Sequence, residues 1–305
     1  MNQSNCMVAQ SGGPTAAINA SLAGVISGIK KSGKYDTCYG AINGILGILN
    51  ERYLNLSQMI PDEKTLNRLK VTPAMYLGSC RHKLPDYKDD DSAYVFIFNQ
   101  FAKLNIKAFF YIGGNDSMDT IKKLSDYAQT VGSPIRFIGV PKTIDNDLEG
   151  TDHTPGYGSA AKYIATVTKE LVRDGLIYEM QSVTVIEIMG RNAGWLTAAA
   201  SLAGVKGAGP DLIYCPENDF DMTSFVEKVK EIYGKNGKCI VAVSEGIHDA
   251  SGKYISEYGN DLSNAKDGFG HAQLGGLASY LAGVLKTETG AKVRGIELSL
   301  LQRCG

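Results

Sequence analysis

Short apolar runs recur along this chain, each followed directly by glycine or polar residues and then by a longer amphipathic stretch. Such runs are typical of buried strands in a parallel sheet, and the stretches between them are typical of crossover helices. The expected strands are 6–9, 108–112, 137–140, 183–188, 212–215, 239–243 and 293–298. The expected helices are 16–30, 93–104, 119–129, 159–174, 195–202, 222–232 and 272–286. This alternation predicts an α/β fold with mainly parallel sheets, whose strand ends supply ligand-binding loops.

The division into domains is less marked in the sequence. The 305 residues suffice for one large or two medium-sized domains. Glycine, proline and acidic residues are densest at 148–158, where we expect a boundary between a domain over 1–155 and a domain over 156–300. The polar stretch 249–267 is expected to form a long loop or a short hairpin.

Bulk composition argues against several classes of function. The net charge of −1, with 21% charged residues, gives no basic excess that would point to nucleic acid or to an anionic membrane surface. No apolar run approaches the length of a membrane span. The six cysteines are scattered, with no CxxC and no histidine at zinc-ligand spacing, which favours a reduced, cytoplasmic setting.

The first glycine-rich loop, Ser11-Gly12-Gly13-Pro14-Thr15, joins the first expected strand to the first expected helix. Its two glycines allow backbone N–H groups to approach an anion at the positive end of a helix. The same residues also suit a tight turn that binds nothing, because glycine-rich turns of this kind are common. No Walker A sequence occurs in the chain.

A second segment, Gly113-Gly114-Asn115-Asp116-Ser117, follows the strand expected at 108–112. Asn115 or Asp116 would suit a helix cap, which is a common role for these residue types. Capping accounts for one polar residue, whereas three follow the double glycine. We therefore favour contact with a ligand.

The most specific functional motif in the sequence is the segment Pro141-Lys142-Thr143-Ile144-Asp145-Asn146-Asp147. In an extended loop Asp145 and Asp147 lie on the same side, where one suits a general base and the other a ligand of metal or water. Lys142 would partly neutralise them or hold a phosphate as a point charge. The alternative is an Asx-rich turn that satisfies its own backbone. Amides, a cation and carboxylates at neighbouring strand ends are the groups that phosphoryl transfer needs.

Three further charged residues are candidates for anion or sugar binding. Arg191 follows the strand expected at 183–188 and suits bidentate binding of a phosphate or carboxylate, or else a surface ion pair. Glu245 follows the strand expected at 239–243 and suits sugar hydroxyls, or else a solvated strand end. Arg81, in Leu77-Gly78-Ser79-Cys80-Arg81, is a candidate anion ligand.

One segment matches a dinucleotide-binding pattern, but its sequence context does not fit that function. Gly156-Tyr157-Gly158-Ser159-Ala160-Ala161 fits GxGxxA, but it follows polar residues rather than a buried strand. That context argues against a nicotinamide cofactor. The four histidines form no serine–histidine–acid pattern and no GxSxG occurs, so acyl transfer is disfavoured.

Six motifs, SGGP, LGSCR, GGNDS, PKTIDND, MGRNAGW and LQR, occur in the order and at the intervals of the 6-phosphofructokinase family, which the whole chain resembles. The resemblance implies two Rossmann-like three-layer domains, one for the phosphoryl donor and one for the sugar phosphate. It also implies Mg²⁺-dependent transfer of a phosphoryl group to O1 of fructose 6-phosphate by a homo-oligomer, either a dimer or a tetramer. Because the family continues beyond LQR, the resemblance implies that a C-terminal part is missing and that residues 301–305 rejoin the first domain.

Two positions separate ATP users from pyrophosphate users in this family. ATP-dependent members have glycine at both, whereas this chain has Asp116 and Lys142, as pyrophosphate-dependent members do. A carboxylate at position 116 adds bulk and negative charge where the α-phosphate of ATP would lie. Lys142 supplies positive charge for the smaller, highly charged pyrophosphate. The resemblance is therefore to the pyrophosphate-dependent group, whose reaction is reversible because the two phosphoryl donors are close in transfer potential.

The resemblance also implies a role for each matching residue. Asp145 would take the proton from O1 while Thr143 helps to hold the sugar, and Lys142 and Asp116 complete the catalytic set. The implied sugar-phosphate ligands are Thr143, Ile144, Asp145, Met189, Gly190, Arg191, Glu245, Arg294 and Arg303, of which Arg294 usually reaches across a subunit interface. The implied donor ligands are Gly12, Gly13, Arg81, Gly114, Ser117 and Lys142. The implied metal ligands are Asn115 and Asp147.

The chain departs from the family at two further positions. Asn115 stands where many members have a metal-binding aspartate, so Mg²⁺ would gain a neutral carbonyl ligand or depend on Asp147 or Asp116. Ser182 stands where ATP-dependent members place an inter-subunit arginine. Two alternatives stay open: an ATP-dependent enzyme, and a non-catalytic regulatory or sugar-phosphate-binding subunit that has kept the fold.

Overall fold

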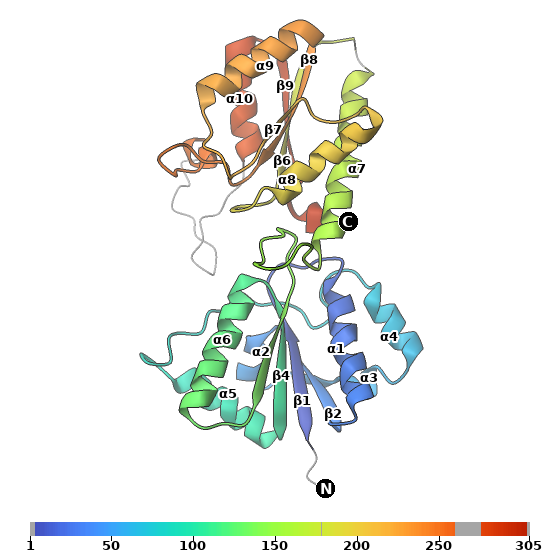
Figure 1. Ribbon diagram of the computed structural model, residues 1–305, viewed down its shortest axis with the longest axis vertical. Helices are drawn as coiled ribbons and strands as arrows, with labels where there is room; N and C mark the ends of the chain where they lie inside the picture. The colour runs from blue at the N-terminus through green and yellow to red at the C-terminus, as the bar shows by residue number, and fades with distance from the viewer. Residues whose placement is uncertain (1–3, 178, 260–275, 304–305) are drawn as a thin grey trace. The chain divides into compact units, whose positions relative to one another are not determined.

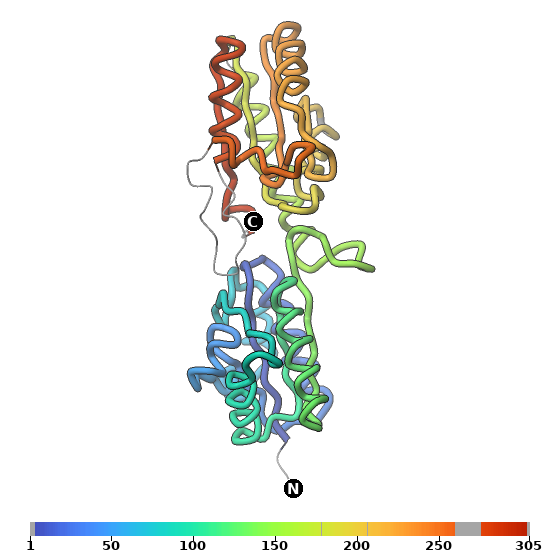
Figure 2. The backbone as a smooth tube through the Cα atoms, turned by 90° about the vertical axis from the view of Figure 1, so that its left-hand side faces the viewer, coloured from blue at the N-terminus to red at the C-terminus, as the bar shows by residue number. Residues whose placement is uncertain are grey.

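The computed structural model describes residues 4–177, 179–259 and 276–303. Within them the chain forms two compact units, one ending at Thr143 and the other running from Ile144 to Arg303. Each unit has its own sheet with helices on both faces, shown as ribbons in Figure 1 and as a backbone tube in Figure 2. The predicted α/β class and the mainly parallel sheets are confirmed.

The first unit contains a five-stranded sheet in the order β3-β2-β1-β4-β5. Its strands are β1 (Asn5–Gln10), β2 (Thr37–Ala41), β3 (Tyr53–Asn55), β4 (Ile106–Gly113) and β5 (Arg136–Pro141). All pair in parallel except β3, which runs antiparallel to β2. The helices are α1 (Ile18–Ser32), α2 (Ile45–Leu49), α3 (Leu56–Met59), α4 (Glu63–Lys70), α5 (Ser92–Lys103) and α6 (Asn115–Thr130).

The alternation of side chains along β1 produces three layers in this unit. Met7 and Ala9 pack on one face of the sheet against residues of α2, α5 and α6. Cys6 and Val8 pack on the other face against residues of α1, α3 and α4. Both faces of the strand are buried, as expected for the centre of a parallel sheet.

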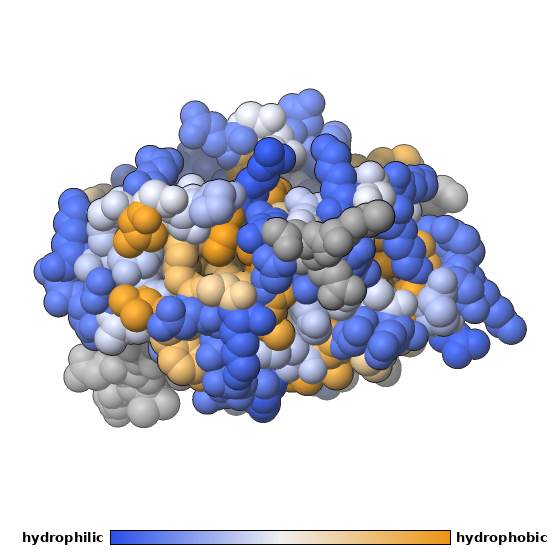
Figure 3. Space-filling model, turned by 90° about the horizontal axis from the view of Figure 1, so that it is seen from below, coloured by the Kyte–Doolittle hydropathy of each residue, from blue (hydrophilic) through white to orange (hydrophobic). Residues whose placement is uncertain are grey.

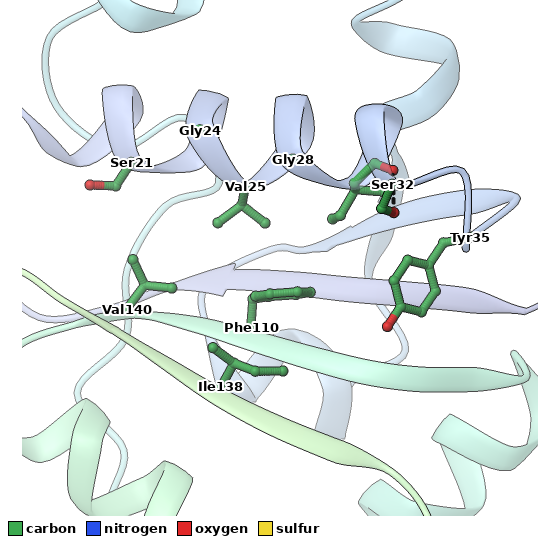
Figure 4. A pocket seen from close by; sticks show the side chains of 10 residues that line it. Ser21, Gly24, Val25, Gly28, Ser32, Tyr35, Phe110, Ile138 and Val140 are labelled. Carbon is green, nitrogen blue, oxygen red and sulfur yellow. Dashed lines mark hydrogen bonds between the residues drawn. The ribbon is translucent and has the colours of Figure 1, made fainter.

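A cavity of about 470 Å³ lies between α1 and the part of β4 and β5 that faces it. Figure 4 shows Val25 of α1 opposite Phe110, Ile138 and Val140 of the sheet. Its lining residues are apolar or small, with no charged side chain among them. The cavity therefore offers no cationic side chain to a phosphate.

The second unit contains a four-stranded, fully parallel sheet in the order β7-β8-β6-β9. Its strands are β6 (Ser182–Ile188), β7 (Leu212–Tyr214), β8 (Lys238–Ser244) and β9 (Lys292–Glu297). Its helices are α7 (Tyr157–Leu176), α8 (Trp195–Ala199), α9 (Met222–Asn236) and α10 (Leu277–Thr289), with 3₁₀ segments at Ala200–Lys206, Ile255–Tyr258 and Ser299–Arg303. Val183 and Val185 of β6 pack with α9 and α10, whereas Ile186 and Ile188 pack with α7 and α8.

All seven expected strands are present, with ends within two residues of their predicted positions. The sequence does not predict β2 or β3, because Gly40 interrupts the first and the second has only three residues. The helix expected at 119–129 begins earlier, at Asn115. Two further expectations fall partly outside the described residues: 272–275 of the expected helix 272–286, and 260–267 of the expected loop or hairpin 249–267. At the start of that loop, a backbone bridge joins His248 to Tyr254.

The two units divide between Thr143 and Ile144, not at the boundary predicted after residue 155. The intervening segment folds with the second unit because Asn146 bonds to the carbonyl oxygen of Asp152 at 3.1 Å and to the backbone N–H of Thr154 at 2.9 Å. Residues 301–303 also belong to the second unit, rather than rejoining the first. The assignment of donor and sugar phosphate to the two units stays a prediction.

Figure 3 shows one face of the molecule, on which polar side chains predominate and apolar side chains form small groups. Scattered apolar side chains of this kind are usual on protein surfaces. Within the part of the chain that the structure describes, no helix combines the length and the apolar character needed to cross a bilayer.

Candidate active site

Three segments that follow strands of the first unit converge at one edge of its sheet. The hydroxyl groups of Ser11, after β1, and Ser117, in the first turn of α6, share a hydrogen bond. The backbone N–H of Lys142, after β5, donates to the carbonyl oxygen of Gly113 at 3.0 Å. Because β1, β4 and β5 are parallel neighbours, their carboxyl ends lie at the same edge. The predicted donor-binding segments are therefore brought together.

The side chain of Lys142 lies close to Gly12 in the first loop. Its φ of +79° lies in the left-handed region that favours glycine. A Cβ at residue 12 would lie 3.5 Å from Lys142 Nζ and 3.7 Å from the backbone nitrogen of Gly114. Lys142 itself is only 4% exposed. The structure therefore holds a positive charge beside the backbone N–H groups of the glycine-rich loop, a combination of groups that can bind a compact polyanion.

The loop that carries Arg81 is attached to the same place. Ser79 Oγ donates to the carbonyl oxygen of Gly12 at 2.7 Å, and Asn43 Nδ2 donates to the carbonyl oxygen of Ser79 at 3.0 Å. Arg81 follows two residues later and is exposed. The structure thus brings Arg81 to the predicted donor-binding loops, on a segment fixed by two hydrogen bonds.

The N-terminus of α6 contains the two residues considered for helix capping. The N-cap residue is Gly114, and Asn115 and Asp116 lie in the first helical turn, so neither occupies the capping position. Asn115 is exposed and Asp116 is half-buried. A carboxylate in the first turn interacts favourably with the helix dipole and reduces the positive potential available to an incoming anion. Asp116 thereby makes this helix end less favourable for anions, and its part in the choice of donor stays a prediction.

The segment 145–147 begins the second unit. Asn146 has a left-handed backbone with φ of +58°, and its side chain makes the two hydrogen bonds to the backbone of residues 152 and 154. These hydrogen bonds span six and eight positions, so the Asn146 side chain closes a wider loop and not the local Asx-rich turn of the alternative interpretation. Asp145 and Asp147, on either side of it, are both half-buried.

The loop after β6 is held against the loop after β8. The N–H of Gly190 donates to Glu245 Oε1 at 3.3 Å, and its carbonyl oxygen accepts a hydrogen bond from Ser244 Oγ. Gly190 has a φ of +135°, and a Cβ there would lie 2.5 Å from the carbonyl oxygen of Ala193, so only glycine fits. Met189, Gly190 and Glu245 are therefore neighbours.

Electrostatic interactions around Glu245 connect most of the predicted sugar-phosphate ligands. Burial raises the pKa of the Glu245 carboxyl, and the negative charge of Asp145 raises it further. The hydrogen bond from Gly190 lowers it, as do the guanidinium groups of Arg191 and Arg303. Two carboxylates and two guanidinium groups thus lie close enough to interact, which is a charge set suited to a phosphorylated sugar.

Arg294 is not brought to this cluster within one chain. It pairs with Thr184 in the register between β6 and β9, several residues before the carboxyl end of β6. Its Nη1 lies 3.6 Å from Asp174 Oδ2, near the end of α7. The role of Arg294 as a sugar-phosphate ligand stays a prediction.

Sequence reasoning missed two buried polar residues beside the site. Glu187 is 6% exposed, and its Oε2 accepts the N–H of Ala278 in α10 at 2.9 Å. Burial raises its pKa to about 7. Gln302 is 1% exposed and contacts Met189 through a hydrogen bond. The sequence contains one signal that could have identified Glu187: it is an acidic residue between two isoleucines at the end of β6.

The residues predicted to bind metal are one amide, Asn115, and one carboxylate, Asp147. Among the residues described, no three His, Cys, Asp or Glu side chains form a group able to hold an ion. Mg²⁺ commonly takes one or two protein oxygens together with substrate phosphates and water. Asn115 lies in the first unit and Asp147 in the second, and their use as Mg²⁺ ligands stays a prediction.

A scan of family models matches residues 5–296 to the model described as phosphofructokinase. The match extends over both units and includes every motif described above except the final one, LQR at 301–303. The chain belongs to the phosphofructokinase family.

The names of individual relatives also state the phosphoryl donor that those proteins use. The chain is 42% identical over 307 residues to the pyrophosphate–fructose 6-phosphate 1-phosphotransferase of Halomonas elongata, covering 99% of this chain and 72% of that protein. It is 44% identical to the enzyme of the same name from Xanthomonas campestris pv. campestris, covering 99% and 71%. Among solved structures, the pyrophosphate-dependent phosphofructokinase of Nitrosospira multiformis matches with a TM-score of 0.83 and 38% identity, covering 99% and 70%.

Proposed function

We propose that the protein transfers a phosphoryl group from pyrophosphate to O1 of fructose 6-phosphate, reversibly and with Mg²⁺, giving fructose 1,6-bisphosphate. The observation that carries the choice of donor is the buried ammonium of Lys142 beside Gly12, together with Asp116 in the first turn of α6. The names of the relatives support the same donor. In this proposal the first unit binds pyrophosphate and the second binds the sugar phosphate.

The donor side works by charge and by size. Lys142 places one positive charge against the phosphates, and the backbone N–H groups of the loops beginning at Ser11 and Gly113 add donors. Pyrophosphate concentrates its charge on two phosphates, so a single buried cation is effective. Asp116 repels a third phosphate, which disfavours ATP.

On the acceptor side, Asp145 takes the proton from the O1 hydroxyl as O1 attacks the nearer phosphorus of pyrophosphate. The bridging P–O bond breaks and inorganic phosphate leaves. Arg191 and Arg303 hold the 6-phosphate while Glu245 accepts from sugar hydroxyls. Mg²⁺, held by the phosphates with Asn115 or Asp147 as protein ligand, supplies charge neutralisation when bound.

Two further proposals follow from the position of Arg294 and from the cysteines. Arg294 lies away from the Glu245 cluster and is half-buried, which supports its use by a second copy in a homodimer or homotetramer.

The cysteines that the structure describes are all free: Cys6, Cys38, Cys80, Cys215 and Cys239. Free thiols are usual in a reducing compartment, which supports a cytoplasmic location.

A donor-swap assay tests the proposal. The protein is incubated with fructose 6-phosphate, Mg²⁺ and either pyrophosphate or ATP, and the bisphosphate is quantified. We expect turnover with pyrophosphate and none with ATP. Equal or faster turnover with ATP would overturn the choice of donor. Calorimetric binding of fructose 6-phosphate without turnover from either donor would instead favour a non-catalytic sugar-phosphate-binding subunit.

A further inference from the structure

We propose that two buried glutamines are positioning residues, Gln302 for the sugar phosphate and Gln10 for pyrophosphate. Each carboxamide joins two segments that carry predicted ligands of one substrate. Gln10 is 0% exposed and Gln302 is 1% exposed, so each acts through the segments it holds. The inference rests on the proposed function and adds to it the residues that align each half of the site.

Gln302 bridges the end of β6 and the 3₁₀ segment that carries Arg303. Its Oε1 accepts the backbone N–H of Met189 at 2.9 Å, and its Nε2 donates to the carbonyl oxygen of Ser299 at 3.0 Å. Both ends of one carboxamide are thus used on backbone. The bridge sets the position of Arg303 relative to Met189 and to Arg191, two residues further on.

The turn that Gln302 supports is strained. Ser299 has a φ of +45°, a left-handed conformation that is unfavourable for a residue with a Cβ. Such a conformation persists only where surrounding contacts enforce it, and it occurs preferentially at functional sites. The hydrogen bond from Gln302 to the carbonyl oxygen of Ser299 is one of those contacts. Its loss would let the segment relax and move Arg303 away from Glu245.

Gln10 makes the corresponding connection in the first unit, at the last position of β1. Its Oε1 accepts the backbone N–H of Leu77 at 2.9 Å. Its Nε2 donates to the carbonyl oxygen of Ile18 at 3.2 Å and to Asn19 Oδ1 at 3.1 Å. Gln10 therefore joins the loop that begins at Ser11 to the loop that leads to Arg81.

The chemistry of the side chain explains its use at both places. A carboxamide donates and accepts at once and carries no charge, so it can satisfy two backbone groups in a buried position. Methionine has a similar shape without hydrogen-bonding groups. The Gln→Met substitution thus removes the bridge while largely keeping the packing.

The test compares Gln302→Met, Gln10→Met and Gln100→Met in the donor-swap assay. Gln100 lies in α5, is 7% exposed and bonds to Glu51 Oε1 at 3.0 Å, which makes it a matched control outside the site. The KM for each substrate, kcat and the melting temperature are measured for every variant. We expect Gln302→Met to raise the KM for fructose 6-phosphate by roughly 10-fold or more, with the KM for pyrophosphate unchanged. Gln10→Met should give the opposite pattern, and Gln100→Met should change neither KM.

A merely structural role predicts something else: lower melting temperatures and a smaller active fraction, with both KM values unchanged. That result, or a rise in the KM for the wrong substrate, would overturn the inference. If a methionine variant does not fold, Gln302→Glu and Gln10→Glu keep the acceptor but lose the donor, and the same substrate-specific rise in KM is expected. A wild-type protein that neither turns over nor binds fructose 6-phosphate would overturn the proposed function and this inference with it.

Discussion

Gly12 and Lys142, which lie far apart in the sequence, are in contact distance of each other: a Cβ at residue 12 would lie 3.5 Å from Lys142 Nζ. The lysine brings a positive charge to the glycine-rich loop, whose left-handed backbone at residue 12 favours glycine. This relationship links the first loop of the unit to the last one. It also makes the two residues the most direct test of how the donor is bound.

Replacing Lys142 by Met removes the charge and keeps the length of the side chain. We expect kcat with pyrophosphate to fall by about 10²-fold or more, because one preorganised electrostatic contact to the transferring group is lost. Binding of fructose 6-phosphate, measured by calorimetry, should not change. Lys123→Met is the control, since Lys123 pairs with Asp119 on α6. An unchanged kcat in Lys142→Met would remove Lys142 from the donor site.

Replacing Gly12 by Ala tests the loop rather than the charge. The left-handed φ of +79° makes any Cβ unfavourable by roughly 1–2 kcal/mol. A backbone shift that relieves this cost would move the loop beside Lys142, so we expect a higher KM for pyrophosphate. Gly28→Ala in α1 is the control, because nothing lies within 4 Å of a Cβ there and its backbone is helical. A free energy of unfolding equal to that of the wild type, measured in urea, would contradict the backbone argument.

Replacing Asp145 by Asn removes the proposed base and keeps the shape. We expect kcat to fall by about 10²–10⁴-fold while the affinity for fructose 6-phosphate is largely retained. Asp152→Asn is a suitable control, since Asp152 is exposed and its backbone rather than its side chain bonds to Asn146. A near-wild-type kcat in Asp145→Asn would assign the proton transfer to another group.

The sequence predicted the parts of the fold and of the candidate site in which the signal is local. The segments beginning at Gly113 and Pro141 stand directly after apolar runs, so their place at strand ends follows from the sequence. The supporting contacts are not local. Gln10 meets Leu77 across 67 positions, and Gln302 meets Met189 across 113. No periodicity or motif reports a side chain whose partner is a distant backbone group.

The predicted domain boundary was wrong for a related reason. Glycine, proline and acidic residues at 148–158 are typical of a linker, but Asn146 ties this segment into a turn of the second unit. Ile144, two residues earlier, packs among the residues of α7 and α8. The buried side chain of Ile144 and the two hydrogen bonds of Asn146 thus attach this segment to the second unit. The composition of the segment predicts neither feature.

Glu187 makes a prediction about stability and pH. Burial raises its pKa from 4.5 to about 7, so the folded chain holds a proton there that the unfolded chain releases between about pH 4.5 and pH 7. The unfolded state then binds fewer protons, and the free energy of unfolding falls as the pH rises through that window. Between pH 5 and pH 8 this one group should lower the free energy of unfolding by roughly 2–3 kcal/mol. Glu187→Gln keeps an acceptor for the N–H of Ala278 and does not titrate.

We therefore expect Glu187→Gln to lose this component of the pH dependence and to exceed the wild type in stability at pH 8. Urea unfolding at pH 5 and pH 8 measures it, with Glu227→Gln on the exposed face of α9 as the control. The control should follow the wild type at both pH values. If Glu187→Gln also loses as much stability as the wild type between pH 5 and pH 8, Glu187 is ionised in the folded protein at pH 5. Its carboxylate would then be held by the N-terminus of α10 strongly enough to outweigh the cost of burial.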